Sequence, residues 1–335
     1  MEIGAIIDKL ARKENLTEEE SKEVMSSIIR GEATSSQIGG YLVGLKVKGE
    51  TTDEILGAVK ALRSNMIPVN IEGEYLIDVC GTGGDGGKTF NISTATAIIA
   101  ASAGIKISKH GNRAISSKCG SADVLRELNI PVDFDAEKGA EAIKRVGMAF
   151  LFAPNFHTAM KNVAKARGEI GTRTIFNLIG PLINPSNLKG QLMGIYDGRL
   201  LKTVGGVLKA QGLDRALVVH GEDGLDEITI TTKTKVCEVG KFGMKEYTIS
   251  PEQFGFKRRR LREISGGDAE KNGEIILKII MGEKGPCRDV VVLNSAAALY
   301  VGNKVDSLIE GKVLAESLID SGKVYDKYLE LVSFN

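Results

Sequence analysis

The sequence has no tryptophan, only three histidines and only four cysteines, and each shortage excludes a class of site. Cys80, Cys119, Cys237 and Cys287 are scattered without C-x-x-C spacing, so neither a disulfide framework nor a zinc site is indicated. The scarcity of histidine leaves few side chains that exchange protons near pH 7. Phosphate and metal chemistry are therefore favoured over acid–base catalysis.

Long apolar runs and an excess of charge of either sign are also missing. One of the longest apolar runs, residues 95–103, is far shorter than the roughly 20 residues of a membrane helix. The first 16 residues carry no basic region followed by an apolar core and a cleavage site. Lys and Arg number 44 against 43 Asp and Glu, so no broad field attracts nucleic acid or an anionic membrane. We expect a cytoplasmic protein that binds neither nucleic acid nor membrane.

The length of 335 residues, 42% of them hydrophobic, favours two domains over one core. Residues 1–66 predict short helices, because they contain a capping box at 17–20, glycine stops at Gly31 and Gly49 and a helix start at 52–54. The pattern then changes to strands and helices. A strand at 75–80, a helix at 93–103 and a strand at 105–108 form a βαβ unit, which implies a parallel sheet.

The alternation of strands and helices continues towards the C-terminus. Helices are expected near 121–129, 136–146, 157–170 and 200–211, and strands at 148–152, 191–196 and 216–220. Partial alternation over 227–248, clearest in residues 228–239, predicts antiparallel strands, and 266–332 is helix-rich. The fold class is α/β. A small N-terminal α-helical domain at 1–70, to which later helices can be added, precedes a larger α/β domain at 71–335 with a mainly parallel central sheet.

A glycine-rich loop at residues 81–87 follows the first strand and leads to a helix whose cap is Asn91 or Ser93. Such a loop can point its amides at a phosphate without obstruction from Cβ atoms. It lacks the Gly-Lys-Ser/Thr ending of a P-loop and the G-x-G-x-x-G spacing of dinucleotide sites. The alternative is a tight glycine turn.

A polar segment, 109–117 with 120–123, follows the second strand, where open α/β sheets place their ligands. Lys109 and the hydroxyls of Ser117 and Ser121 are suited to a sugar phosphate. The alternative is a solvated polar loop.

Two further segments carry candidate ligand groups. Residues 221–227 are rich in acid and follow a strand, and their carboxylates suit a Mg²⁺ ion that holds substrate phosphates. A solvated acidic turn is the alternative. Arg167 lies on a helix before the apolar segment 174–185, so its guanidinium can hold a carboxylate while the apolar residues pack an aromatic ring. The alternative for Arg167 is a surface ion pair.

Two other features are interpreted as structural. Residues 257–262 are strongly basic, but without interleaved aromatics they favour a solvated loop over a nucleic-acid site. His157 and His220 have no second histidine or cysteine at metal spacing, so we expect capping or packing roles.

In this order, the segments resemble the anthranilate phosphoribosyltransferase family over nearly the whole chain. The motifs are GTGGD at 81–85, NIST at 91–94, KHGNRAISS at 109–117, the helix reaching Arg167, RTIFNLIGPLINP at 173–185 and HGEDGLDE at 220–227. Pyrimidine nucleoside phosphorylases share the fold but fit the anthranilate-side segments less well. The chain differs from the family's usual pattern at Cys119, often serine, and at Thr158, commonly proline.

The resemblance implies transfer of the 5-phosphoribosyl group of phosphoribosyl pyrophosphate (PRPP) to the amine of anthranilate, with Mg²⁺. The products are N-(5-phosphoribosyl)anthranilate and pyrophosphate, in the second step of tryptophan biosynthesis from chorismate. The resemblance also implies that PRPP binds in a cleft between the two domains and that the protein forms a homodimer through the helical domain. The alternatives are a nucleoside phosphorylase of the same fold and a nucleic-acid-binding paralogue without catalysis.

The resemblance also assigns roles to individual residues. The catalytic residues are Lys109, His110 and Arg167, and Mg²⁺ is held by Ser93, Asp226 and Glu227, with Asp85 as the next candidate. Anthranilate is expected at Gly81, His110, Asn112, Arg167 and Pro181. The PRPP site is expected to comprise Gly81, Thr82, Gly84, Asp85, Thr89, Asn91, Ile92, Ser93, Thr94, Lys109, Gly111, Asn112, Arg113, Ala114, Ile115, Ser116, Ser117 and Ser121.

Overall fold

The structure, a computed structural model, describes residues 2–83, 87–114 and 118–334. Five residues assigned to PRPP from the sequence, Gly84, Asp85, Ile115, Ser116 and Ser117, lie outside the described residues. The chain divides into two compact units, one of Met1–Pro68 with Pro154–Pro185 and one of Val69–Ala153 with Ser186–Asn335. The segment Pro154–Pro185, which lies beyond the expected boundary at residue 70, is thus grouped with the first unit. No helix in the described part of the chain is long and apolar enough to span a membrane.

The first unit is helical. Its elements include α1 (Ile3–Ala11), α2 (Glu18–Ile29), α3 (Ser35–Lys48), α4 (Thr52–Arg63), α9 (Lys161–Ile170) and α10 (Phe176–Ile179). Capping boxes headed by Thr17, Thr34 and Thr51 begin α2, α3 and α4, so the start predicted at 52–54 is confirmed. The helix predicted at 157–170 is shorter, because a 3₁₀ turn at Thr158–Met160 precedes α9.

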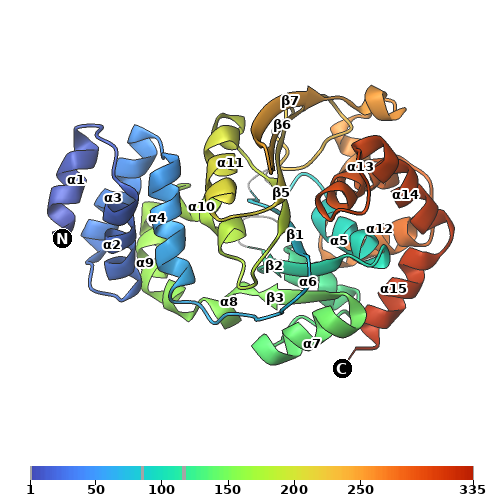
Figure 1. The fold of residues 1–335 in the computed structure, drawn as a ribbon, viewed down its shortest axis with the longest axis horizontal. Helices are drawn as coiled ribbons and strands as arrows, with labels where there is room; N and C mark the ends of the chain where they lie inside the picture. The colour runs from blue at the N-terminus through green and yellow to red at the C-terminus, as the bar shows by residue number, and fades with distance from the viewer. Residues whose placement is uncertain (1, 84–86, 115–117, 335) are drawn as a thin grey trace. The chain divides into compact units, whose positions relative to one another are not determined.

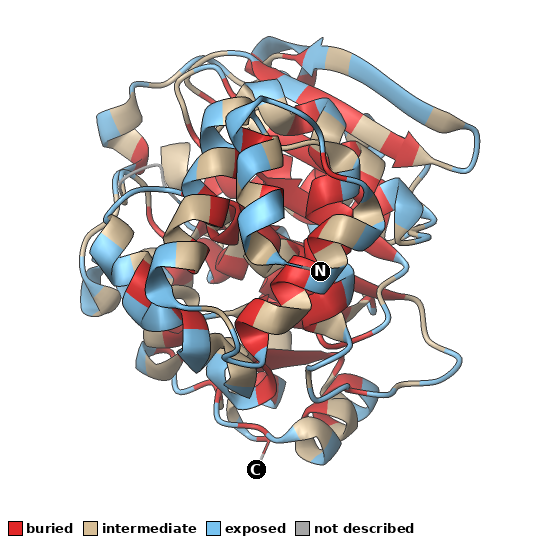
Figure 2. Cartoon of the chain, turned by 90° about the vertical axis from the view of Figure 1, so that its left-hand side faces the viewer, coloured by how far each residue is buried: buried red, intermediate tan, exposed pale blue. Residues whose placement is uncertain are grey.

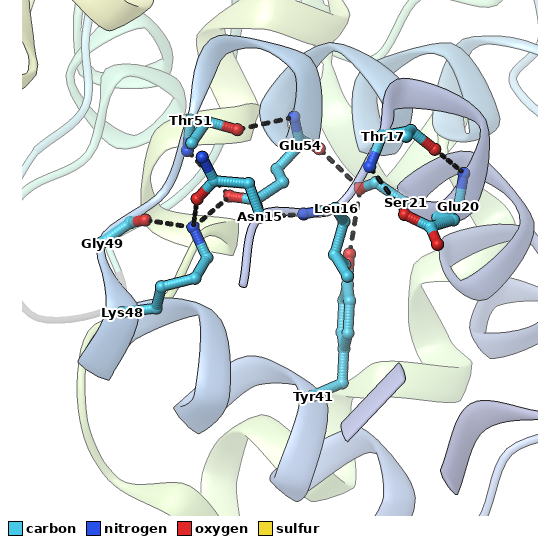
Figure 3. A network of polar contacts seen from close by, with 10 residues as sticks. All are labelled: Asn15, Leu16, Thr17, Glu20, Ser21, Tyr41, Lys48, Gly49, Thr51 and Glu54. Carbon is cyan, nitrogen blue, oxygen red and sulfur yellow. Dashed lines mark hydrogen bonds and ion pairs between the residues drawn. The ribbon is translucent and has the colours of Figure 1, made fainter. Parts of the chain in front are cut away.

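A buried carboxylate at the start of α4 bonds to the segment before α2 and to the end of α3 (Figure 3). Glu54 is fully buried, and its Oε1 accepts from the amide of Leu16 at 2.8 Å. Its Oε2 accepts from Lys48 Nζ at 2.9 Å and from the amide of Thr51 at 2.8 Å. A buried charge is stable only when it is paired and hydrogen-bonded, so these three donors explain an acid at this position.

The second unit contains a seven-stranded sheet in the order β3-β2-β1-β4-β5-β6-β7 (Figure 1). The strands β1 to β5 run parallel, and β6 and β7 are antiparallel, so the mainly parallel sheet is confirmed. The strands are β1 (Leu76–Gly81), β2 (Lys106–Gly111), β3 (Met148–Phe152), β4 (Gly190–Gly194), β5 (Arg215–Gly221), β6 (Thr234–Gly240) and β7 (Gly243–Ile249).

Two strand predictions need correction. The strand expected at 105–108 extends to Gly111, so Lys109 and His110 are strand residues rather than loop residues. Residues 228–233 are irregular, with bends at 230–232, and β6 begins only at Thr234. The alternation of residues 228–239 misled the prediction because the threonines at 229 and 231 satisfy polar groups within a turn instead of a sheet.

Helices cover both faces of the sheet (Figure 1). Apolar α5 (Ile92–Ser102) and α13 (Pro286–Val301) are almost entirely buried over one face, and α11 (Leu201–Ala210) covers the other. The strands are red along most of their length in Figure 2, whereas β7 is largely exposed. The other α-helices in the described part of the chain are α6 (Ser121–Glu127), α7 (Ala136–Val146), α8 (Ala153–Phe156), α12 (Ala269–Ile280), α14 (Leu308–Asp320) and α15 (Lys323–Val332).

The strand order reverses between β1 and β4. The chain proceeds from β1 through β2 to β3 on one side and from β4 to β5 on the other. Open α/β sheets bind ligands outside the carboxyl ends of the strands at such a switch point. The glycine loop after β1 and the acidic segment after β5 both leave the sheet at this edge.

Candidate active site

The glycine loop is anchored to the neighbouring strand and to the acidic segment. The amide of Thr82 donates to the carbonyl of Gly194 at 2.9 Å, and the Thr82 hydroxyl accepts from the amide of Tyr196 at 3.1 Å. The amide of Gly83 donates to Asp226 Oδ2 at 2.7 Å. The loop after β1 and the segment after β5 therefore meet directly, although they are far apart in sequence.

Two paired glycines make room for Asp226. Gly81 and Gly194 lie side by side at the ends of β1 and β4. A Cβ on Gly81 would lie 2.4 Å from Asp226 Oδ2, and one on Gly194 would lie 1.6 Å from the backbone oxygen of Asp226. Neither position accepts a side chain without displacing the acidic segment. Asp226 is only 8% exposed, so the alternative of a solvated acidic turn is wrong for this residue.

Lys109 is a buried lysine that lies between β1 and the start of α5. It is 1% exposed, and its Nζ donates to the carbonyl of Val79 at 2.6 Å and lies 3.4 Å from Ser93 Oγ. Burial lowers the pKa of Lys109, and the negative charges of Asp78 and Glu227 oppose that shift. The solvated-loop alternative is therefore wrong for Lys109, which supplies positive charge from inside the sheet edge.

The other described residues of the predicted sugar-phosphate segment lie at the end of β2 and just before and at the start of α6. His110 is buried and pairs with Leu151 of β3, whereas Asn112 is exposed. The carboxylate of Asp123 accepts from the amides of Ala114 and Gly120, each at 2.9 Å. These bonds tie Ala114 and Gly120 to the first turn of α6, which Ser121 begins. Gly111 ends β2, and the guanidinium of Arg113 lies 5.5 Å from the ring centre of Phe152.

The N-terminus of α5 faces the same edge, as expected for an anion site. Asn91 is its N-cap residue, and its side chain bonds to two other segments. Its Nδ2 donates to the carbonyl of Cys119 at 3.3 Å, and its Oδ1 accepts from Asn272 at 3.0 Å. The buried hydroxyl of Thr94 has no hydrogen-bond partner in the described part of the chain. Ile92 is buried, and Thr89 bridges to Ser265 before the helix.

The proposed anthranilate residues Arg167 and Pro181 belong to the helical unit. The Arg167 guanidinium lies 5.1 Å from the ring centre of Phe176 and, among the described residues, forms no salt bridge. Burial lowers its pKa, with no carboxylate acting against that shift. The alternative of a surface ion pair is thus not supported. Pro181 lies in the 3₁₀ turn Gly180–Ile183.

The features interpreted as structural have structural partners. Burial lowers the pKa of His157 to about 4, against a hydrogen bond with the backbone of Ile183. His220 Nδ1 lies 2.8 Å from the carbonyl of Ile195. In the basic segment 257–262, three arginines pair with acids at Glu252, Asp289 and Glu263.

Several polar residues at this edge were missed by the sequence interpretation. Asp78 could most easily have been found from the sequence, because it is an acid within an apolar strand. The structure shows that it is fully buried and that its charge acts on Lys109. Asp123 lies in the predicted polar segment, and it and Asn272 bond to backbone amides three and five residues away. Asn294 gives no local sequence signal, because its partner Ile228 is distant in sequence.

Comparison with known proteins agrees with this architecture. Residues 5–66 match the helical bundle domain of the glycosyl transferase family, and residues 73–325 match its a/b domain. The anthranilate phosphoribosyltransferase of Clostridium beijerinckii is 61% identical over 99% of this chain and 98% of its own length.

Two solved structures give the same result. The crystal structure of anthranilate phosphoribosyltransferase from Thermus thermophilus has a TM-score of 0.92 and 40% identity, with 98% of each chain covered. The enzyme from Saccharomyces cerevisiae in complex with PRPP and Mg has a TM-score of 0.89 and 25% identity, covering 99% of this chain and 98% of that one.

The fold and its site define a glycosyl transferase built from a helical bundle and an α/β domain. Sequence identity to curated relatives over nearly the whole chain shows which family within this class the protein belongs to. The chain belongs to the anthranilate phosphoribosyltransferase family, as the sequence motifs indicated.

Proposed function

We propose that this chain transfers the 5-phosphoribosyl group of PRPP to the amine of anthranilate, giving N-(5-phosphoribosyl)anthranilate and pyrophosphate in tryptophan biosynthesis. One observation carries the proposal beyond the family relationship. The amide of Gly83, the carboxylate of Asp226, and Ser93 beside buried Lys109 gather at the switch point of the sheet. That arrangement offers amides and a cation to phosphates and an acid to a metal ion.

The residues fit Mg²⁺. The described residues contain no group of three or more His, Cys, Asp or Glu side chains suited to a metal. Mg²⁺ is commonly bound by one or two carboxylates together with substrate phosphates, not by an all-protein cage. Asp226, Glu227 and Ser93 are the proposed ligands, and the bond from Gly83 to Asp226 occupies only part of the acceptor capacity of a carboxylate. When bound, Mg²⁺ would neutralise charge on the departing pyrophosphate.

The chain's own groups have complementary tasks. Lys109, the loop amides and the N-terminus of α5 stabilise the phosphates of PRPP, because charge develops on the leaving group as the bond to C1 breaks. We propose the full PRPP set named from the sequence for this role. Anthranilate attacks as an uncharged aromatic amine, so orientation by Arg167, Asn112 and Pro181 matters more than deprotonation by His110.

We also propose a cytoplasmic location and a homodimer formed through the helical domain. The exposed apolar residues Val43 and Val47 on α3 support the second point, because apolar side chains on a helix surface are suited to burial by a partner. The proposed domain division places PRPP binding in the α/β domain after residue 70.

Anthranilate fluorescence tests the reaction. Purified protein with anthranilate, PRPP and Mg²⁺ should consume the fluorescent substrate, and omission of PRPP or Mg²⁺ should stop the change. A parallel reaction with inorganic phosphate and a pyrimidine nucleoside should release no base. Stable anthranilate fluorescence in the complete mixture, from protein shown to be folded, would refute the proposed function, and release of base would favour a nucleoside phosphorylase.

A further inference from the structure

The backbone just after the acidic pair is held by a fully buried amide. Asn294 lies on α13 with 0% exposure, and its Oδ1 accepts from the amide of Ile228 at 3.0 Å. Its Nδ2 donates to the carbonyl of Ile228 at 2.8 Å and to that of Val290 at 2.9 Å. Asn294 therefore satisfies both backbone groups of the residue next to Glu227.

The same segment is held from within by Asp223. Its Oδ2 accepts from the hydroxyls of Thr229, at 2.6 Å, and of Thr231. Its Oδ1 accepts from the amide of Leu225 at 3.2 Å. Residues 222–233, which belong to no strand, are thus fixed on both sides of the acidic pair without the regular ladder of a sheet.

The burial of the Asn294 side-chain amide indicates that its hydrogen bonds matter to this part of the fold. A fully buried polar side chain destabilises a fold unless its hydrogen bonds are made. At neighbouring Ser295, equally buried on α13, the hydroxyl has no hydrogen-bond partner within the described residues. Two of the three bonds of Asn294 hold the backbone beside the acidic pair to α13, and the third, to Val290, lies within the helix. Groups behind metal ligands orient those ligands, and their loss typically weakens metal binding.

We propose that Asn294 is a positioning residue that sets the place of the Asp226 and Glu227 carboxylates for the metal ion. This role rests on the proposed function of the acidic pair. Asn294 itself touches neither substrate nor metal. It acts through the backbone of Ile228, and Asp223 supports the same segment from its other side.

The test measures Mg²⁺-dependent PRPP binding by calorimetry without anthranilate, so that no turnover is needed. Asn294→Ala should raise the Mg²⁺ concentration for half-maximal PRPP binding about tenfold to a hundredfold. It should also lower kcat and leave the KM for anthranilate near the original value. Ser295→Ala is the matched control, at the next position of the same buried helix, and should leave the Mg²⁺ midpoint unchanged.

Two further variants keep the test decisive if Asn294→Ala does not fold. Asn294→Asp keeps the shape and the acceptor for Ile228 but removes both donated bonds, and Asp223→Ala alters a partly exposed position. Each should raise the Mg²⁺ midpoint. A folded Asn294 or Asp223 variant with the original midpoint would overturn the positioning role.

The reference variant is Asp226→Asn combined with Glu227→Gln, which tests the metal role directly. A raised midpoint in this variant, together with unchanged midpoints in the Asn294 variants, overturns the positioning role alone. An unchanged midpoint in the reference variant refutes metal binding by the acidic pair, and the positioning role then falls with it.

Discussion

Replacement of Arg167 by alanine should weaken recognition of anthranilate without affecting PRPP. The guanidinium is partly buried, lies over the ring of Phe176 and has no salt bridge among the described residues. It is therefore available to a substrate carboxylate. A hydrogen bond to a charged group contributes about 1.5–3 kcal/mol, and about 1.4 kcal/mol corresponds to a factor of ten. The KM for anthranilate should rise about tenfold to a hundredfold.

Steady-state kinetics with each substrate varied in turn provide the measurement. Lys165→Ala is the matched control, because Lys165 lies on the same helix with a side chain that is 79% exposed. Arg167→Lys should give an intermediate KM, since lysine keeps the charge but loses the planar fork that binds a carboxylate through two bonds.

Aniline separates carboxylate recognition from a general disturbance of the site. It carries the aromatic amine without the carboxylate, so the original enzyme and Arg167→Ala should use it equally poorly. A rise in the KM for PRPP equal to that for anthranilate would refute the reasoning. If Arg167→Ala used aniline much less well than the original enzyme does, the reasoning would also be refuted, because aniline has no carboxylate to lose.

Three other perturbations have defined outcomes. His110→Ala should lower kcat by only about tenfold to a hundredfold, since an uncharged amine needs little help from a base; complete inactivity of a folded variant contradicts this. Asp226→Asn with Glu227→Gln should raise the Mg²⁺ needed for half-maximal rate and lower kcat, and an unchanged Mg²⁺ titration would move the metal elsewhere. His157 has its folded pKa lowered to about 4, so the unfolded chain takes up its proton first as pH falls. Stability should decline by about 3 kcal/mol between roughly pH 6.5 and 4, and urea unfolding of His157→Gln should lack most of that decline.

The order of elements could be predicted from the sequence because local patterns determine it. The strand Met148–Phe152 and the helix Ala136–Val146 have the predicted bounds, since a continuous apolar run and an amphipathic, Asp-capped helix are both local signals. The grouping of Pro154–Pro185 with the N-terminal helices could not be predicted in this way. It depends on which apolar faces meet in three dimensions, and periodicity within one helix does not encode that choice.

Within the candidate site, too, some residues could be predicted from local sequence and others could not. Glycine loops and acidic turns are recognisable because their composition reflects a local backbone requirement. The burial of Asp226 was not predicted from the sequence. The backbone of Asp226 lies against Gly194 at the end of β4, so the missing side chain of this glycine matters only because the fold brings the acidic segment there. Asn294 is still further from local prediction, since its partner Ile228 is 66 residues away.

The hydrogen bond between buried Asp226 and Gly83 links the proposed binding of Mg²⁺ to that of PRPP. The Asp226 carboxylate accepts from the amide of Gly83, so this bond couples the acid to the residue after Thr82. When bound, Mg²⁺ would be held by the Asp226 carboxylate, and the amide of Gly83 would be close enough to serve a phosphate oxygen of PRPP. Because linked binding is reciprocal, we expect PRPP and Mg²⁺ to strengthen each other's binding at the proposed site.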